Sequence, residues 1–352
     1  MNVIIVSRRF NPGHFSHLVA NYKLFKDCGF SPCLFVDKAF NKMDEKGEFE
    51  KTNAIAELNN LKSIDAAVFW FPSLMNLVDI LVLRLIFRSR VVYVFHEPFD
   101  SIRNYLRSGF TLKKVLRICL INIVNLPVIL FSHHIVLPSR ASFLLYKKRY
   151  TFLNNNFSQI PLLFDDEAVV LHEKSKKCIS YIGTIAPDHA FDRFVEFVDS
   201  ALNNEWFPRF QYQIATSSTI PAKERAILRP HVLSGKVVIS EGHPMSTAEI
   251  NDYFRDSLVV WNAYHRSNQS GVLPKAYMFG AAVIVLSRNV NEFIEDRQTG
   301  ILINDNSDVN EIKNAIEEII ANKDLYFKNC REKFFKYFYY KNNAERFLAF
   351  IK

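Results

Sequence analysis

The chain has 352 residues, of which 49% are hydrophobic and 23% are charged, and its formal net charge is +8. Its 10 glycines and 13 prolines are too few for a disordered or collagen-like chain, and its length allows two globular domains with complete cores. The 5 cysteines are scattered and lack the spacing of a zinc site, so we expect reduced thiols.

The sequence predicts neither a secretory signal nor a membrane-spanning segment. The first apolar run, Val3–Val6, is too short for the core of a signal peptide and is soon followed by two arginines. The most apolar stretch, residues 118–131, is shorter than about 20 residues and contains Asn122, Asn125 and Pro127. We therefore expect a cytoplasmic protein.

The first half of the chain alternates strand-like and helix-like patterns. This alternation is typical of a doubly wound α/β fold with a parallel sheet. In such sheets ligands bind beyond the carboxyl ends of the strands, so the loop that holds Gly13 and His14 is a candidate binding loop. A solvated turn is the alternative for that loop. The apolar runs of strand length cover residues 3–6, 31–36, 66–71, 91–95 and 134–137.

A polar triplet, His96-Glu97-Pro98, follows the strand predicted at 91–95. A lone histidine is more often structural, but its position at the carboxyl end of a buried strand favours a site. His96 could act as a hydrogen-bond partner, whereas Glu97 could act as a general base on a hydroxyl group.

The segment from Ser101 to Phe164 contains no acidic residue. Between residues 103 and 116 its cations alternate with apolar residues, as in a basic amphipathic surface that lies on an anionic membrane. A solvated basic face is the alternative, and no nucleic-acid motif accompanies the cations. We therefore expect the 103–149 basic region to contact an anionic membrane surface and no nucleic acid. Its cations are Arg103, Arg107, Lys113, Lys114, Arg117, Arg140, Lys147, Lys148 and Arg149.

A second set of strand-like runs begins after a charged, linker-like segment at 171–177. We predict a domain boundary near residue 170, with Rossmann-like domains over 1–170 and 171–335 and a helical, aromatic tail over 336–352. The runs of the second domain cover residues 178–182, 212–215, 237–239, 257–261, 282–286 and 301–303.

The most informative stretch covers residues 264–302. Ser270 and Gly271 precede a short helix with Pro274 in its first turn, and Gly280 ends that helix. A Ser-Gly pair at the start of a helix presents unpaired backbone N–H groups, which suit a phosphate or pyrophosphate. An ordinary capped helix without a ligand is the alternative.

This stretch resembles a known family of proteins. The pattern SGVLPxAYxFGxxVI, followed by NEFIEDxxTGIL, is similar to the donor-binding segment of glycosyltransferases with the GT-B fold. The resemblance is closest to the large retaining nucleotide-sugar family that includes many lipopolysaccharide and capsule enzymes. In that family the segment usually carries two glutamates, and Ser267 and Lys275 replace them here. A further helix is expected to begin at Asn291, where Glu292 matches a glutamate common in the family.

The resemblance implies a fold of two Rossmann-like, doubly wound domains, with the donor bound mainly by the second. The backbone of Ser270 and Gly271 would bind the donor diphosphate, and Gln269 belongs to a variant form of this loop. Glu292 would contact the donor, and the loop that holds His243 would contact the nucleotide base.

The cations that bind the diphosphate in related enzymes are replaced in this chain. Related enzymes follow the strand and glycine, here Gly183, with an arginine and a lysine, whereas this chain has Thr184 and His189. Lys275, together with Arg266, is expected to neutralise the diphosphate instead.

The resemblance also places His96 beside the donor sugar and the loop of Gly13 and His14 on the acceptor side. We therefore predict transfer of a sugar from a nucleotide sugar to a hydroxyl of a glycan or lipid-linked saccharide acceptor, without a metal or other cofactor. The basic region implies a peripheral position on the inner face of the cell membrane and a role in surface polysaccharide assembly. The tail at 336–352 would cross back to the first domain.

Two other functions remain open from the sequence. One is a nucleotide-sugar epimerase of the same fold, which would act on the donor alone and would not need a basic face. The other is a non-catalytic GT-B protein that binds a glycan or a partner enzyme, which the replaced glutamates and cations would permit.

Overall fold

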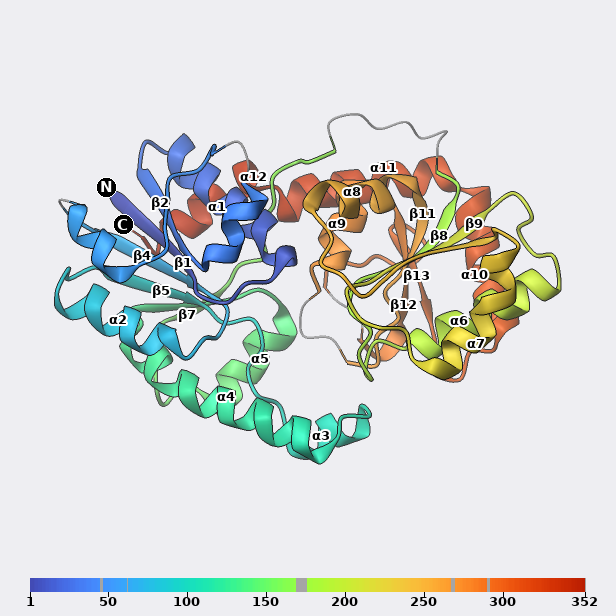
Figure 1. Ribbon diagram of the computed structural model, residues 1–352, viewed down its shortest axis with the longest axis horizontal. Coiled ribbons are helices and arrows are strands. Elements are labelled where there is room, and N and C mark those ends of the chain that lie inside the picture. Colours follow the sequence, from blue (N-terminus) through green and yellow to red (C-terminus); the bar gives the residue numbers. More distant parts are fainter. Residues whose placement is uncertain (45–46, 62, 169–175, 267–269, 290–291, 352) are drawn as a thin grey trace. The chain divides into compact units, whose positions relative to one another are not determined.

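The computed structural model describes residues 1–44, 47–61, 63–168, 176–266, 270–289 and 292–351. The chain divides into two compact units, shown in Figure 1. Unit 1 consists of Met1–Asp165 and Tyr337–Lys352, and unit 2 consists of Asp166–Lys336. The boundaries expected from the sequence, near 170 and 335, differ from these by a few residues, and the C-terminal tail folds with unit 1.

The described strands of unit 1 form one parallel sheet in the order β3-β2-β1-β4-β5-β6-β7. In the centre of the sheet Ile4 is in register with Cys33 on one side and Ala67 on the other. The short edge strands β3 and β7 were not predicted, because their half-buried residues form no apolar run. The strands are β1 (Asn2–Ser7), β2 (Ser31–Val36), β3 (Lys51–Thr52), β4 (Ala66–Trp70), β5 (Arg90–Val94), β6 (His134–Leu137) and β7 (Phe157–Gln159).

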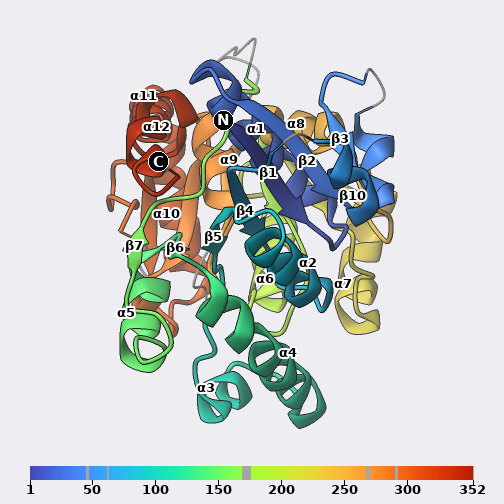
Figure 2. The ribbon, with the colours of Figure 1, turned by 90° about the vertical axis from the view of Figure 1, so that its left-hand side faces the viewer.

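Helices cover both faces of the unit 1 sheet. In Figure 1, α1 (Phe15–Asp27) and α12 (Tyr340–Leu348) lie on one face, and α2 (Met75–Leu85) and α4 (Leu112–Phe131) lie on the other. Figure 2 shows α2 and α4 on the same side of the sheet, with α3 (Ile102–Arg107) next to α4. Helix α5 (Arg140–Arg149) packs on β6 and β7.

The basic amphipathic stretch forms two helices, α3 and α4. Ser108 and Gly109 separate them, and Gly109 has a positive φ of 84°. Helix α4 has 20 residues and contains an 18-residue stretch with a mean hydropathy of 1.9, so by length and composition it could cross a membrane. The length of the apolar stretch therefore does not exclude a membrane-spanning helix, because the helix already begins at Leu112. Within unit 1, Asn122 and Asn125 lie on its buried face.

The described strands of unit 2 also form a parallel sheet, in the order β10-β9-β8-β11-β12-β13. The strands are β8 (Cys178–Ile182), β9 (Gln211–Ala215), β10 (Val237–Ser240), β11 (Ser257–Trp261), β12 (Ala282–Leu286) and β13 (Gly300–Ile303). Helices α8 (Thr247–Asp256), α9 (Val272–Met278) and α11 (Lys323–Lys333) pack on one face, and α6 (Phe191–Asn203), α7 (Ala222–Leu233) and α10 (Val309–Ala321) pack on the other (Figure 1).

The helix expected to begin at Asn291 is a turn in the described residues that follow. Asn291 itself lies outside the described residues, and Glu292 and Phe293 form a turn. Arg297 then adopts a left-handed conformation with φ 58°, and its N–H donates to the carbonyl of Gly300. The chain thus reverses into β13 too early for a helix to form.

Gly280 ends α9 as the sequence predicts, and its surroundings explain why glycine is needed. Its φ is 66°, and a Cβ atom there would lie 2.4 Å from Cδ2 of Phe327 on α11. Gly235, after α7, has a similar φ of 74°, but a Cβ atom there would meet nothing within 4 Å. A side chain at Gly235 would therefore cause only conformational strain, whereas a side chain at Gly280 would also clash with Phe327.

We expect Gly280→Ala to lower the free energy of unfolding by roughly 2–5 kcal/mol, because left-handed strain adds to overpacking against Phe327. Gly235→Ala is the matched control and should lower it by about 1–2 kcal/mol through strain alone. Urea unfolding of both variants measures the difference. Equal effects of the two substitutions would contradict the assigned contact with Phe327.

Candidate functional site

Each sheet reverses its winding direction at one point. In unit 1 the order of strands reverses between β1 and β4, and in unit 2 it reverses between β8 and β11. The connections on the two sides of such a point pass over opposite faces of the sheet, which leaves a crevice at the carboxyl ends of the two strands. These two switch points are therefore the expected ligand-binding positions.

At the switch point of unit 2, the loop after β8 lies against the start of α9. Gly183 has φ 131°, and a Cβ atom there would lie 3.4 Å from Cγ2 of Val272 and 3.7 Å from Oη of Tyr264. The hydroxyl of Ser270 accepts a hydrogen bond from the N–H of Val272 at 3.2 Å. The structure thus brings together three residues expected to bind the donor, namely Gly183, Ser270 and Gly271.

The two residues that replace the expected cations make local contacts in this loop. The carbonyl of Thr184 accepts from Oη of Tyr181 at 2.8 Å and lies 2.5 Å from Nδ1 of His189. The imidazole of His189 stacks on Tyr264, with ring centroids 4.2 Å apart and planes at 15°. His189 therefore fixes the loop after β8 against the loop after β11.

Arg266, one of the two cations expected to neutralise the diphosphate, lies beside this loop. Its Nη1 lies 3.9 Å from Oδ2 of Asp188, and the side chains of Arg266 and Asp188 are only 12% and 7% exposed. The carbonyl of Asp188 accepts from the N–H of His265 at 2.7 Å. A buried carboxylate thus compensates part of the Arg266 charge and holds it beside the loop after β8.

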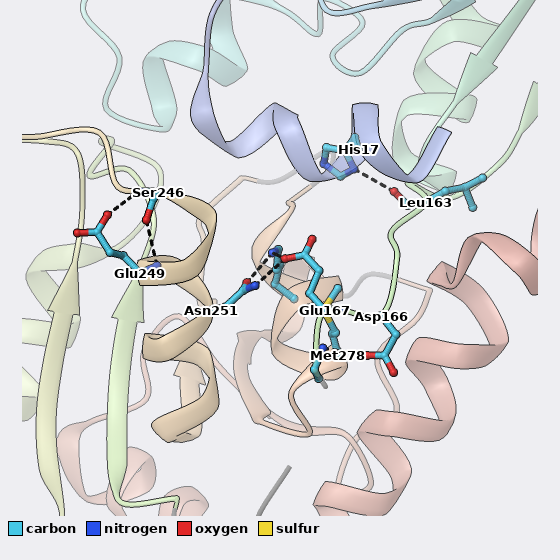
Figure 3. Close-up of polar contacts among 10 residues, drawn as sticks. His17, Leu163, Asp166, Glu167, Ser246, Glu249, Asn251 and Met278 are labelled. Carbon is cyan, nitrogen blue, oxygen red and sulfur yellow. Dashed lines mark hydrogen bonds and ion pairs between the residues drawn. The ribbon is translucent and has the colours of Figure 1, made fainter. Parts of the chain in front are cut away.

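Lys275 lies in a network that the sequence did not predict. Its Nζ donates to Oε2 of Glu167 at 2.6 Å and to Oδ1 of Asn251 at 2.7 Å. Nδ2 of Asn251 donates to the same Glu167 oxygen at 2.7 Å, which closes a triangle (Figure 3). Burial lowers the pKa of Lys275, and the Glu167 carboxylate opposes this shift. The ammonium is thus already neutralised within unit 2, and its expected role toward a diphosphate stays a prediction.

Two other residues expected to bind the donor, His243 and Glu292, follow strands that do not flank the switch point. His243 is exposed after β10, an edge strand two positions away from β8, and its Nδ1 lies 3.0 Å from the carbonyl of Glu241. Glu292 is exposed in the turn that follows β12. Gln269 lies outside the described residues.

At the switch point of unit 1, side chains from the ends of three strands meet. His14 follows β1, Phe71 follows β4 and His96 follows β5. The ring of Phe71 stacks on His14, with centroids 3.2 Å apart, and on His96, with centroids 4.3 Å apart. The indole of Trp70 lies 5.5 Å from His96. The predicted residues His14 and His96 therefore share one aromatic cluster.

Burial sets the protonation state of the two histidines. It is the main cause that lowers the pKa of His14 to about 2 and the pKa of His96 to about 3, and neighbouring His17 lowers both values further. Both imidazoles are therefore neutral at pH 7. Since a group with a pKa near 3 is a weak base, His96 suits the role of hydrogen-bond partner better than that of general base.

The other candidates of unit 1 are more exposed. Glu97 is exposed directly after His96. Gly13 is exposed in the short 3₁₀ helix Pro12–His14, and its N–H donates to Oδ1 of Asn11 at 3.0 Å. In the parts of the chain that the structure describes, histidine, cysteine and carboxylate side chains form no group of three that could hold a metal ion.

Sequence reasoning missed Glu167, Asn251 and Phe71. Glu167 belongs to the first acidic run after the acid-free segment, Asp165-Asp166-Glu167, which could have indicated an ion-pairing segment. Asn251 and Phe71 carry no such signal, because only packing brings an amide of α8 to Lys275 and an aromatic turn residue to two histidines.

Two doubly wound parallel units with these switch points define a protein of the GT-B fold. Residues 176–322, most of unit 2, match the family model described as "Glycosyl transferases group 1". This segment is therefore similar to group 1 glycosyltransferases, and the chain is a glycosyltransferase. A comparison with curated protein sequences gives no significant match.

Solved structures agree on the fold. Sucrose-phosphate synthase from Thermosynechococcus elongatus has a TM-score of 0.71 at 13% identity, over 99% of this chain and 97% of that one. HepE of Anabaena, solved in complex with UDP-glucose, has a TM-score of 0.70 at 14% identity, over 99% of both chains. WaaG, a glycosyltransferase involved in lipopolysaccharide biosynthesis, has a TM-score of 0.64 at 10% identity, again over 99% of both chains.

We expect Lys275→Met to lower the free energy of unfolding by about 3–5 kcal/mol, because it leaves the Glu167 carboxylate without its cation in a mostly buried site. The double variant Glu167→Gln/Lys275→Met should recover much of this loss. A double-mutant cycle in urea gives the coupling energy.

The ion pair of Lys313 and Glu317 on α10 is the matched control for this cycle. It is more exposed, so its coupling energy should not exceed about 1 kcal/mol. A similarly small coupling between Glu167 and Lys275 would show that the network is not a stabilising one.

Proposed function

We propose that this glycosyltransferase moves a sugar from a nucleoside diphosphate sugar to a hydroxyl of a lipid-linked saccharide at an anionic membrane surface. The match of residues 176–322 to the group 1 model carries the donor part of this proposal. In unit 2 the switch point holds a glycine loop, a Ser-Gly pair and the cation Arg266. HepE, which shares the fold, binds UDP-glucose, and this supports a related donor here.

In the proposed reaction, the bond between the anomeric carbon of the sugar and the diphosphate oxygen breaks. A bond forms between that carbon and the acceptor oxygen, the acceptor hydroxyl loses its proton, and the nucleoside diphosphate departs with the bonding electrons. Catalysis then depends on holding both substrates in place and on stabilising the charge of the departing diphosphate. We assign that stabilisation to Arg266 and to the backbone of Ser270 and Gly271, and we expect no metal or other cofactor.

We assign the reacting carbon to the neighbourhood of His96. Its imidazole is neutral at pH 7 because burial lowers its pKa to about 3, so it can hydrogen-bond to a sugar hydroxyl without adding charge. Glu97 is exposed and adjacent, and it is the candidate base for the acceptor hydroxyl. Gly13 and His14, after the neighbouring β1, are the candidates for acceptor binding.

The outer face of unit 1 supports a membrane-bound acceptor. The α4 residues Leu112, Leu116, Leu120 and Ile123 recur at helical spacing, and each is more than half exposed. Helices α2 and α3 contact α4, and exposed apolar residues also occur in or next to them, namely Leu74, Val78, Leu85, Ile86, Ile102 and Leu106. Apolar groups in this number on a surface are typical of an interaction face.

Cations border the apolar stripe of α4. Lys113, Lys114 and Arg117 are exposed beside it, and no acidic residue occurs from Ser101 to Phe164. A helix with an apolar stripe and a basic flank fits the boundary between lipid headgroups and acyl chains. We therefore propose that the 103–149 basic region holds the protein on the inner face of the cell membrane, where lipid-linked precursors of surface polysaccharides would be its acceptors.

A thermal-shift panel of UDP, GDP, ADP and their glucose conjugates tests the donor site. At about 100 times its dissociation constant, a bound donor should stabilise the protein by roughly 2.7 kcal/mol. Arg266→Ala should reduce that stabilisation, because it removes the cation assigned to the diphosphate. Arg288→Ala is the matched control, since Arg288 pairs with Asp305 in the same unit but is 49% exposed. If no member of the panel shifts the transition, the donor proposal is wrong.

Co-sedimentation with vesicles tests the membrane surface. The triple variant Lys113→Ala/Lys114→Ala/Arg117→Ala should bind phosphatidylglycerol vesicles roughly a hundredfold more weakly, at about 1 kcal/mol per cation, while binding to phosphatidylcholine stays low. The control Lys223→Ala/Arg229→Ala/Lys236→Ala removes the same charge from exposed positions of unit 2. If both triple variants lose vesicle binding equally, net charge alone explains the binding. That result would contradict a specific membrane-binding face on unit 1.

A further inference from the structure

The turn after β4 holds an aromatic residue in an unfavourable backbone conformation. Phe71 has φ 58°, in the left-handed region where a bulky side chain is strained. Its carbonyl accepts a hydrogen bond from Nδ2 of Asn76 at 2.8 Å, and Asn76 is fully buried at the start of α2. A buried amide thus stabilises the strained turn and sets the direction in which the Phe71 ring points.

The ring of Phe71 separates two imidazoles. The planes of His14 and His96 are nearly parallel to it, at 9° and 19°, with centroids 3.2 Å and 4.3 Å away. Two parallel rings at these distances would overlap if they shared one face of the phenyl ring. His14 and His96 therefore lie on opposite faces of Phe71, and the carboxyl ends of β1, β4 and β5 are joined through one stack of three rings.

Each imidazole retains a ring nitrogen for other contacts. Nδ1 of His14 and Nε2 of His96 are buried and have no hydrogen-bond partner among the described residues, and the same holds for Nε1 of Trp70. Buried polar atoms of this kind are rarely left unsatisfied unless a water, an ion or a ligand meets them. Three such atoms in one aromatic cluster leave hydrogen-bonding capacity there that the described residues do not use.

The charged and titratable groups that face this stack favour neutral imidazoles. Arg9 and His17 lie near His14, and His17 also lies near His96. His17 itself stacks at 5.7 Å on Trp70, and its Nδ1 lies 3.2 Å from the carbonyl of Leu163. A neutral imidazole can either donate or accept through its free nitrogen, whereas a protonated one can only donate.

We propose that Phe71 is a positioning residue for glycosyl transfer, which holds His14 and His96 at a fixed separation so that their imidazoles can hydrogen-bond to hydroxyl groups of the bound sugar and acceptor. The proposal rests on the role of His96 proposed above. A smaller side chain at this position would let both imidazoles turn and take up water. Water would lower the penalty for protonation, so the two pKa values would rise toward the ordinary value of about 6.5.

The test is an NMR titration of the histidine rings in the full-length protein between pH 3 and pH 8, without any ligand, with His14→Ala and His96→Ala used for assignment. In the unaltered chain both pKa values lie at or below the lower end of this range, and we expect Phe71→Leu to raise both so that the two rings titrate within it. Phe71→Tyr keeps an aromatic ring and should restore the low values. Phe207→Leu is the matched control, because Phe207 is a phenylalanine with a similar φ of 56° in unit 2. It should leave both titrations unchanged.

A second variant tests the support of the turn. Asn76→Ser removes the amide donor but keeps the ring, and it should raise the same two pKa values by a smaller amount. If Phe71→Leu does not fold, Asn76→Ser tests whether the turn at Phe71 positions the two histidines. Unchanged titrations in every variant that folds would overturn the proposal and reduce Phe71 to a packing residue.

A separate readout keeps this proposal distinct from the proposed function. Release of UDP from UDP-glucose, measured for the wild-type chain and His96→Ala, reports on the role of His96. If His96→Ala retains full activity while Phe71→Leu raises the histidine pKa values, the proposed role of His96 fails and the positioning of the rings stands. If His96→Ala is inactive but the pKa values do not move, the positioning role fails instead.

Discussion

Parallel pairing of the described strands is the constraint on which the rest of this structure depends. Parallel neighbours cannot be joined by a tight turn, so the chain crosses a face of the sheet between them, usually as a helix. In unit 1 the direction of these crossings reverses at β1, and in unit 2 it reverses at β8. The loops at each reversal diverge and leave backbone groups open at the sheet edge, where the candidate residues collect.

The two switch points differ in their electrostatics. The unit 1 cluster contains neutral histidines and aromatic rings, because burial lowers the pKa of His14 and of His96 well below 7. The unit 2 switch point contains Arg266 beside a buried carboxylate, and Lys275 is neutralised by Glu167 nearby. Neutral hydrogen-bonding groups suit sugar hydroxyls, and a held cation suits a diphosphate, so this contrast matches the division of substrates proposed here.

Ion pairs also fix the position of the boundary between the two units in the chain. Asp165 pairs with Lys23 of unit 1 at 2.5 Å, whereas the next residue, Asp166, pairs with Arg331 of unit 2 at 2.8 Å. Glu167 then joins the Lys275 network, and its N–H donates to Sδ of Met278 at 3.4 Å. Figure 3 labels Glu167 and Met278 next to each other. Of these three consecutive acidic residues, Asp165 is therefore paired within unit 1, and Asp166 and Glu167 are paired within unit 2. The boundary between the units thus falls at the peptide bond between Asp165 and Asp166.

The sequence by itself determined the strand runs, the α/β class, the start and end of α9 and the acid-free basic region, because apolar periodicity, Gly280 and charge counts are local properties. It also supported the GT-B resemblance, and it placed His14 and His96 at strand ends. Only the tertiary structure decided that Lys275 is bound by Glu167, that the predicted helix at Asn291 gives way to a turn, and that Phe71 separates two histidines. These features depend on which side chains meet across the fold, and pairs such as Lys275 and Glu167, 108 residues apart, leave no trace in local sequence patterns.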